Sequence, residues 1–383
     1  MSEDKPQNIK TNKAKRHLRY LWTALLVVLV VAIACCFIWQ KHLWNVESID
    51  EKLAAIDAEL AIPDSENAAV YYMRFLSNQN NAYILDDLAS YSPSAYCEPW
   101  ADIEHPELAA KLKKHSTFIQ TLLNISEMQQ ARFLVYPNPS SSSFTLAEMR
   151  KVTFILSWAA ANDLVEGRID VAYSKYRCQL KLAYHLQQQP ATYYRLVGIA
   201  IEAVAFGNIK RAVMRDEITP EQLRSLEMIL ETPSNQYKVN GKIADRVDRL
   251  IEEKEMSELS LVARLKYWLY DRATRKSRKQ REQRQHQRIH ASQQAIRILI
   301  VLRRHKEETD TWPETLEQIE PKLPEQMLTD PQNSSSFVYK RHGNSFIFYS
   351  KGPNGIDESG VASKPADDYP IWPRKITKIP AVE

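Results

Sequence analysis

The chain has 383 residues and a formal net charge of +4, a length that exceeds the usual single domain and predicts two folded units with accessory segments. Glycine occurs only 8 times. Because glycine serves turns that need a positive φ, its scarcity excludes a turn-rich architecture and, together with long stretches rich in Ala, Leu, Glu, Lys and Gln, predicts a mainly α-helical protein.

Residues 20–40 are almost wholly apolar and predict a transmembrane helix. At ~1.5 Å per residue this run crosses a hydrocarbon core of about 30 Å, and the rings of Tyr20 and Trp39 match the headgroup layers at its two ends. Lysine and arginine are concentrated in residues 1–19. The positive-inside rule therefore predicts a cytoplasmic tail, a single-pass anchor in a bacterial inner membrane and a periplasmic location for the bulk of the chain.

A cleaved signal peptide is the alternative, because a basic stretch followed by an apolar run also describes secretory signals. The segment Ala32–Cys35 resembles the cleavage box of a lipoprotein. Residues 37–39 extend the apolar run past that cut to full spanning length, so we favour the uncleaved anchor.

The segment after the anchor predicts a series of helices. Residues 41–62 carry apolar side chains at three- and four-residue spacing and predict a juxtamembrane helix, which Pro63 ends. We expect an exported α-helical domain over residues 63–263. Its first helix begins after residues 64–67, whose polar side chains suit the capping of free backbone donors, and the proline-interrupted segment 78–106 predicts a connection.

A helical hairpin is predicted further along the exported domain. Helical periodicity runs from residue 107 to residue 135 and ends at residues 137–143, a proline- and serine-rich cluster that predicts a break. Residues 146–186 then form two apolar stripes around a turn at Gly167. A small turn residue followed by Ala and Tyr resembles tetratricopeptide-type helix pairs, although no strict repeat period recurs.

Two more helices follow the hairpin. Residues 192–209 are apolar on nearly every side and predict a central buried helix, and Thr219-Pro220 predicts a capped helix start. Residues 64–232 resemble an uncharacterised group of bacterial exported helical proteins, which share an Asn-Ala-Ala-x-x-Tyr start, the hairpin around Gly167 and a Leu-Val-Gly-Ile-Ala helix. This resemblance implies no activity.

Residues 264–310 predict a basic connecting helix. Such a run attracts phosphates, but the predicted periplasmic location excludes nucleic acid as a partner. Anionic lipid or an acidic partner is one interpretation, since each basic residue near an anionic surface contributes about 1 kcal/mol, and a solvated helix is the favoured one. The candidate contact residues are Arg275, Lys276, Arg278, Lys279 and Arg281.

The region 311–383 predicts a small α+β unit. Residues 337–340 and 345–350 are aromatic and β-branched, and they flank a Gly-containing turn, which predicts an antiparallel hairpin. Before the hairpin come Trp312-Pro313 and Asp330-Pro331, and it ends in Tyr-Ser-Lys-Gly-Pro-Asn-Gly.

These ordered motifs resemble the C-terminal region of type II secretion major pseudopilins over residues 291–362. The resemblance implies a pseudopilin-like α+β architecture, an envelope location and a link to a secretion or pilus-like system. No prepilin-peptidase site precedes the anchor, the anchor lacks the buried glutamate of assembling pilins, and a helical domain separates anchor from sheet. We therefore do not expect polymerisation in the pilin manner.

Many major pseudopilins bind calcium in the loop that matches residues 350–360. The resemblance therefore implies a Ca²⁺ site at Asn354, Asp357 and Glu358, completed by loop carbonyls. This loop offers fewer acids than the usual calcium-binding version. A turn held by its own hydrogen bonds is the alternative.

Cysteine and histidine residues give weaker signals. Cys97 and Cys178 fall in the predicted exported part, where an oxidising compartment permits a disulfide between them, and separate buried thiols are the alternative. His286 and His290 are one helical turn apart but lie in a cationic stretch without a nearby carboxylate, so we expect no metal there. The chain has no Gly-x-Ser-x-Gly, His-Glu-x-x-His or phosphate-binding glycine motif, and we assign no catalytic or cofactor-binding residue.

The sequence as a whole predicts a non-enzymatic, membrane-anchored envelope protein that acts as an interaction or assembly module with a protein partner. The alternatives are an exported enzyme of unrecognised class and a lipoprotein with a peptide-binding helical domain. A buried pocket with convergent polar groups of perturbed pKa favours the enzyme, whereas an exposed apolar groove favours the binding module.

Overall fold

The computed structural model divides the chain into two compact units, residues 1–52 and residues 53–383. It describes most of the chain from residue 48 onward. The described residues are 29–30, 33, 48–90, 98–135, 139–231, 241–257, 259–324, 326–362 and 367–373, without the side chains of 139–145 and of most residues from 261 to 279. The predicted tail 1–19 and anchor 20–40 lie outside the described residues except for Leu29, Val30 and Ile33, which are helical. Among the helices that are described, none has both the length and the apolar character to cross a bilayer.

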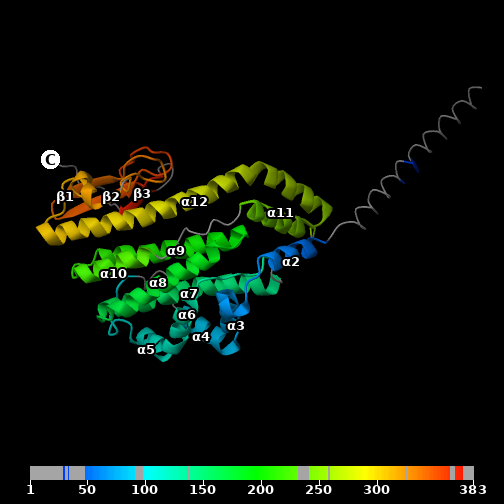
Figure 1. The fold of residues 1–383 in the computed structure, drawn as a ribbon, viewed down its shortest axis with the longest axis horizontal. Coiled ribbons are helices and arrows are strands. Elements are labelled where there is room, and N and C mark those ends of the chain that lie inside the picture. Colours follow the sequence, from blue (N-terminus) through cyan, green and yellow to red (C-terminus); the bar gives the residue numbers. More distant parts are fainter. Residues whose placement is uncertain are drawn as a thin grey trace, which may run out of the picture. The chain divides into compact units, whose positions relative to one another are not determined.

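The described residues form eleven α-helices and a three-stranded antiparallel sheet of order β1-β2-β3, so the mainly α-helical fold class is confirmed (Figure 1). Short 3-10 turns lie at 64–66 (η1), 316–318 (η2) and 320–322 (η3). The helices are α2 (Ile49–Glu59), α3 (Ala68–Leu76), α4 (Gln79–Ala89), α5 (Pro106–Lys114), α6 (Ser116–Ser126), α7 (Pro139–Val165), α8 (Ile169–Gln187), α9 (Thr192–Val213), α10 (Pro220–Leu230), α11 (Gly241–Ser257) and α12 (Leu261–Thr309). The strands are β1 (Val338–His342), β2 (Ser345–Ser350) and β3 (Tyr369–Trp372).

Local capping explains where several helices begin. The Asn67 side-chain oxygen accepts a hydrogen bond from the Ala69 backbone N–H at 3.1 Å, which starts α3. The predicted start at Thr219 is confirmed as a capping box with Gln222. Both caps satisfy backbone donors that the first helical turn leaves without partners.

Two predictions for the early helices were wrong. Residues 78–106 are not only a connection, because α4 lies within them, capped by the Asn78 side chain and anchored by the buried Leu85 and Leu88. The helical periodicity predicted to residue 135 stops short, because α6 ends at Ser126 and residues 127–135 are not helical, so the cluster 137–143 ends no helix. Pro139 is instead the first residue of α7, a position where proline costs no intrahelical hydrogen bond.

The predicted hairpin is confirmed as α7 and α8, joined at Gly167 with φ +76°. Helix α9, the predicted central helix, packs against α7, α8 and α12. Its Gly198 lies against α8 so closely that a Cβ there would be 2.7 Å from the Ala183 carbonyl oxygen. This close approach explains why the helix tolerates a residue of poor helix propensity.

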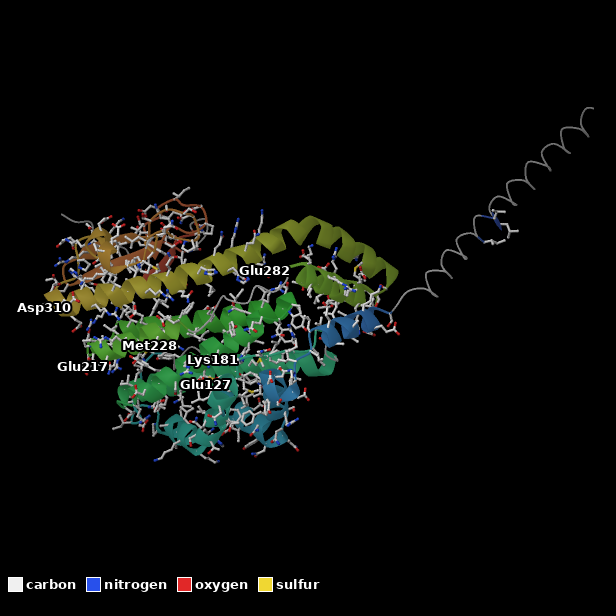
Figure 2. All side chains as sticks on the ribbon, in the orientation of Figure 1. Glu127, Lys181, Glu217, Met228, Glu282 and Asp310 are labelled. Carbon is white, nitrogen blue, oxygen red and sulfur yellow. The ribbon has the colours of Figure 1, made fainter. Side chains whose placement is uncertain are left out.

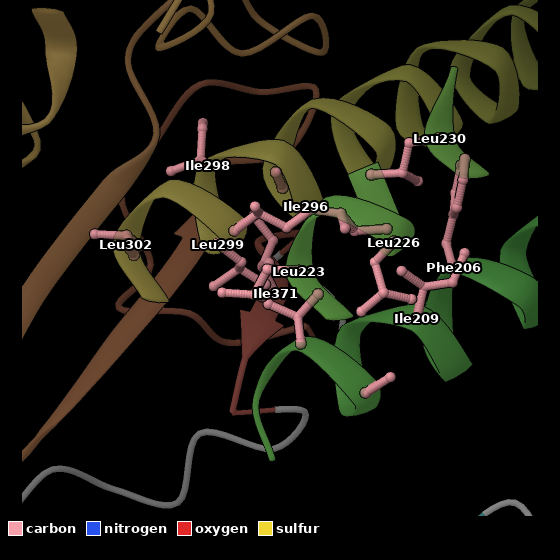
Figure 3. Packing of buried hydrophobic residues seen from close by; sticks show 14 of the residues in the cluster. Phe206, Ile209, Leu223, Leu226, Leu230, Ile296, Ile298, Leu299, Leu302 and Ile371 are labelled. Atoms are coloured by element: carbon pink, nitrogen blue, oxygen red, sulfur yellow. The ribbon is translucent and has the colours of Figure 1, made fainter. Parts of the chain in front are cut away.

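One hydrophobic core joins the helices to the sheet. The C-terminal half of α12, from Ile289 to Leu302, packs against α9 and α10, and the sheet adds apolar side chains such as Phe348 and Ile371 (Figure 3). The predicted β-hairpin is confirmed: β1 pairs with β2, and Val338 lies opposite Tyr349. The third strand, β3, pairs with β2 and was not predicted.

We predict that Gly198→Ala lowers the thermal midpoint of unfolding. The added Cβ overlaps the Ala183 carbonyl, a backbone atom that moves only if α8 and α9 separate, and overpacking of this kind costs about 1–3 kcal/mol.

Gly207→Ala, in the same helix, is the matched control. Nothing lies within 4 Å of its Cβ position, so its higher helix propensity stabilises by up to about 1 kcal/mol. Thermal denaturation followed by circular dichroism compares the two, and an equal effect of both substitutions contradicts the close packing of α8 and α9.

Candidate functional site

A cavity of about 770 Å³ opens between α5, α6, α7 and α8. Its apolar lining includes Leu112, Ile119 and Ala159, one from each of α5, α6 and α7. Its polar lining comes mostly from the end of α7 and the start of α8. The polar residues are Asp102, Lys113, Ser116, Gln120, Asn162, Asp163, Arg168, Asp170, Ser174 and Lys175.

A buried ion pair lies in the lining of this cavity. Lys175 Nζ on α8 donates to Asp163 Oδ2 on α7 at 2.5 Å, and both side chains are less than a tenth exposed. The turn at Gly167 brings these two residues together, because it reverses the chain between the helices that carry them. Since an isolated buried charge is costly, the pair holds the two helix ends in one arrangement.

Three more polar side chains extend the pair into a network. Arg168 Nε donates to Asp163 Oδ1 at 2.7 Å, and Arg168 also donates to the Asn162 side-chain oxygen at 2.6 Å. The Asn162 amide in turn donates to Asp102 Oδ1 at 2.7 Å. Each side chain is held by another, so the polar part of the cavity is preorganised.

Another ion pair joins the residue that follows α6 to α8 on the surface. Lys181 Nζ lies 2.5 Å from a carboxylate oxygen of Glu127, whose side chain is 49% exposed (Figure 2). Such exposed pairs contribute about 0–1 kcal/mol, because water screens their charges. The Asp163–Lys175 pair differs in its burial rather than in its distance.

Cys178 is buried on α8, and its Sγ lies 3.7 Å from the Leu122 carbonyl oxygen. Burial raises the pKa of Cys178 to about 12, so the reactive thiolate form is scarce at neutral pH. Cys97 lies outside the described residues, and a disulfide between the two stays a prediction.

The predicted basic surface is described only in part. Residues 275–279 belong to helix α12, but their side chains, those of Arg275, Lys276, Arg278 and Lys279, lie outside the described residues. Arg281 is exposed on the same helix. Contact with an anionic surface stays a prediction.

The predicted calcium residues lie in one loop after β2. Asn354 donates to Glu358 Oε1 at 3.1 Å, and Asp357 Oδ1 accepts from the Tyr349 hydroxyl at 2.7 Å. Among the described residues no group of three or more His, Cys, Asp or Glu side chains is arranged to hold a metal ion. The loop is therefore organised by its own hydrogen bonds, and calcium binding stays a prediction.

Two acids beside this loop were missed by the sequence reasoning. Asp367 Oδ1 and Asp368 Oδ1 are buried without a hydrogen-bond partner among the described residues. The other carboxylate oxygen of Asp368 accepts from the backbone N–H groups of Glu358 and Gly360 at 2.9 and 2.7 Å. Burial raises the pKa of Asp368. The two adjacent aspartates are visible in the sequence. They lie outside residues 350–360, the loop to which the resemblance assigned calcium, and were therefore not considered.

Two buried titratable groups lie outside the cavity lining. Burial lowers the pKa of His185 to about 4, and its Nε2 lies 2.9 Å from the Met128 carbonyl oxygen. Burial raises the pKa of Glu202 on α9 to about 7, and its carboxylate accepts from the Gln187 amide at 2.6 Å. Both groups sit in helix contacts, so we assign them to packing.

No protein-family model matches the chain, and comparisons with curated proteins and with solved structures find no significant match. The resemblances to pseudopilins and to an exported helical group rest on the residues quoted for them.

The raised pKa of Glu202 predicts a pH dependence of stability. The folded state keeps this proton to about pH 7, whereas a carboxyl of ordinary pKa 4.5 has already lost it in the unfolded state. The contribution of Glu202 to the free energy of unfolding is therefore fully present below pH 4.5 and falls by about 3 kcal/mol as the pH rises through 7.

Urea denaturation at several pH values between 4.5 and 8 measures this slope, and we expect Glu202→Gln to remove the part that Glu202 contributes. Glu217→Gln, at an exposed position (Figure 2), is the control and should keep the parent slope. Identical pH profiles for Glu202→Gln and the parent protein refute the assignment.

Proposed function

We propose that this chain is a non-enzymatic, membrane-anchored binding module of the bacterial envelope, and that the cavity between α5, α6, α7 and α8 is its ligand site. The observation that carries the proposal is the cavity itself, which combines an apolar lining with the preorganised network of Asp163, Lys175 and Arg168. Its volume of about 770 Å³ falls in the range of small-ligand and peptide-side-chain sites.

Binding fits the cavity better than catalysis does. Both oxygens of Asp163 are engaged in ion pairs, so this carboxylate is poorly placed to accept a proton from a substrate. His185, Glu202 and Cys178 are buried groups with displaced pKa values, and none of these three lines the cavity. The network instead offers fixed charges and hydrogen-bond donors that orient a ligand.

The compartment and the assembly role are proposed on the sequence. The apolar run at 20–40 and the basic residues before it support a single-pass anchor with the helical domain in the periplasm. The tetratricopeptide-like hairpin of α7 and α8, and the pseudopilin-like motifs after residue 291, support an interaction role near a secretion or pilus-like system.

Site-specific photo-crosslinking in intact cells tests the ligand site. A photoreactive residue at Val171, a cavity-lining position that is 46% exposed, should form adducts with the bound partner. The same residue at Met228 on α10, 63% exposed and outside the cavity lining, is the matched control (Figure 2). Adducts specific to Val171 support the site, whereas adducts at Met228 without any at Val171 refute it.

A calcium site in the C-terminal loop is a second proposal, favoured by the two orphaned oxygens of Asp367 and Asp368. Two carboxylate oxygens that are buried without a partner among the described residues suit a hard cation, which prefers oxygen ligands. Asp357 and Glu358 lie in the same loop, and Glu358 Oε2 accepts from the Asp367 backbone N–H at 2.8 Å. We propose that Ca²⁺ draws Asp367 and Asp368 together with Asn354, Asp357 and Glu358, the loop residues predicted from the sequence, and so fixes the loop to the sheet.

Thermal denaturation in calcium and in the chelator EGTA tests this site. Calcium at a hundredfold excess over its Kd stabilises by about 2.7 kcal/mol, which raises the thermal midpoint by roughly 5 °C. We expect Asp368→Asn to abolish the increase and Asp310→Asn, at a fully exposed position, to keep it. The same midpoint with and without calcium in the parent protein contradicts the proposal.

A further inference from the structure

Among the described residues that line the cavity, the buried acceptors have hydrogen-bond partners, whereas a buried donor has capacity left. Asp163 is 6% exposed, and its two carboxylate oxygens are taken by Arg168 and Lys175. Asp102 gives one oxygen to Asn162. Asp102 and Asp170 are exposed, as are Arg168 and Lys113, so water can satisfy what these four side chains leave over. Lys175 is buried, and its remaining capacity is not met by water.

Donors are left over in the same network. The Lys175 ammonium has three protons, and among the described residues it meets two acceptors, Asp163 Oδ2 and, at 3.5 Å, the Val171 carbonyl. Arg168 has five N–H donors, and two of them serve Asp163 and Asn162. Lys113 on α5 adds a third cation to the lining. The lining holds three carboxylates and three cations, so its polar end has N–H donors to offer without a net charge.

The remaining lining is apolar. Leu112, Ile119, Leu123 and Ala159 contribute carbon surface from three helices. A polar ligand leaves this carbon surface in contact with water, whereas a ligand with an apolar body removes the surface from water and is stabilised by its burial. A small inorganic anion would use the donors and leave the apolar lining empty.

We propose that the ligand is a carboxylate carried on an apolar body, with its carboxylate held by Lys175, Arg168 and Lys113. This inference rests on the proposed function, because it names the ligand class of the same cavity. Charge-assisted hydrogen bonds from the two fixed cations recognise the carboxylate, and the apolar lining recognises the body. The source is either a small molecule with an alkyl chain or the free C-terminus of a peptide with apolar side chains, which share this chemistry.

Calorimetric titration of the full-length chain in phosphatidylcholine nanodiscs tests the inference, with empty nanodiscs as the blank. One arm compares octanoate with the neutral octan-1-ol, and the other compares an apolar tetrapeptide that has a free C-terminal carboxylate with its C-terminal amide. The charge-assisted contacts predict that at least one acid binds with a Kd about tenfold or more below that of its neutral analogue. The arm that shows the difference identifies the source.

Variants connect the binding to the named residues. Lys113→Gln, at an exposed position that leaves the core intact, should raise the Kd of the acid about threefold to tenfold. Lys114→Gln, the next residue along and outside the lining, should change it less than about twofold. Lys175→Met removes the buried cation and should abolish binding, with a thermal melt to confirm that the variant is folded.

The outcomes separate this inference from the proposed function. Equal affinity for the acids and their neutral analogues, or equal effects of Lys113→Gln and Lys114→Gln, overturns the carboxylate assignment. If Val171 still forms specific photo-adducts in that case, the cavity remains a ligand site and only the ligand class is wrong. If neither adducts nor acid binding occurs, both proposals fall.

Discussion

The structure of the candidate site depends on the buried ion pair between Asp163 and Lys175. Removing two charges from water costs several kcal/mol per ion, and their attraction offsets that cost only when the geometry is good and the remaining hydrogen-bonding groups are satisfied. Arg168 and Asn162 meet that condition by taking the second carboxylate oxygen and fixing the guanidinium. The pair therefore adds little to net stability. Its main effect is to hold the ends of α7 and α8 in a single arrangement, and this arrangement shapes the polar side of the cavity.

A second polar network holds the same helices in register deeper in the core. The Gln179 amide on α8 donates to the Thr153 carbonyl and the Ser157 hydroxyl on α7, and Asn208 on α9 donates to Ser157 and to Gln179. All four side chains are buried, and sliding any helix by a residue would leave donors unpaired. Together with the close contact at Gly198, this network makes α7, α8 and α9 a rigid support, on which the cavity residues keep their positions.

The sequence predicted helices whose signals are local and missed features that depend on distant residues. The capping box at Thr219, the turn at Gly167 and the aromatic hairpin after Phe337 each follow from neighbouring residues, and the structure contains all three. Helix α4 was hidden because its polar surface resembles a connection, and its Leu85 and Leu88 become informative only when α7 packs on them. The cavity was missed because Asp163 and Lys175 belong to different helices, where each reads as an ordinary surface charge until the hairpin closes.

Strand β3 was also invisible in the sequence, and it explains how the C-terminal sheet joins the helices. Tyr369 in β3 receives a hydrogen bond from Ser292 on α12 at 3.1 Å, and its ring lies under the Arg288 guanidinium, 4.1 Å from the ring centre. Burial alone would raise the pKa of Tyr369, but the nearby cations, Lys210 on α9 foremost, lower it below its usual value. Tyr369 directly follows Asp368, whose second oxygen holds the loop after β2. A contact that orders the loop after β2 therefore also orders β3, the strand through which the sheet contacts α9 and α12.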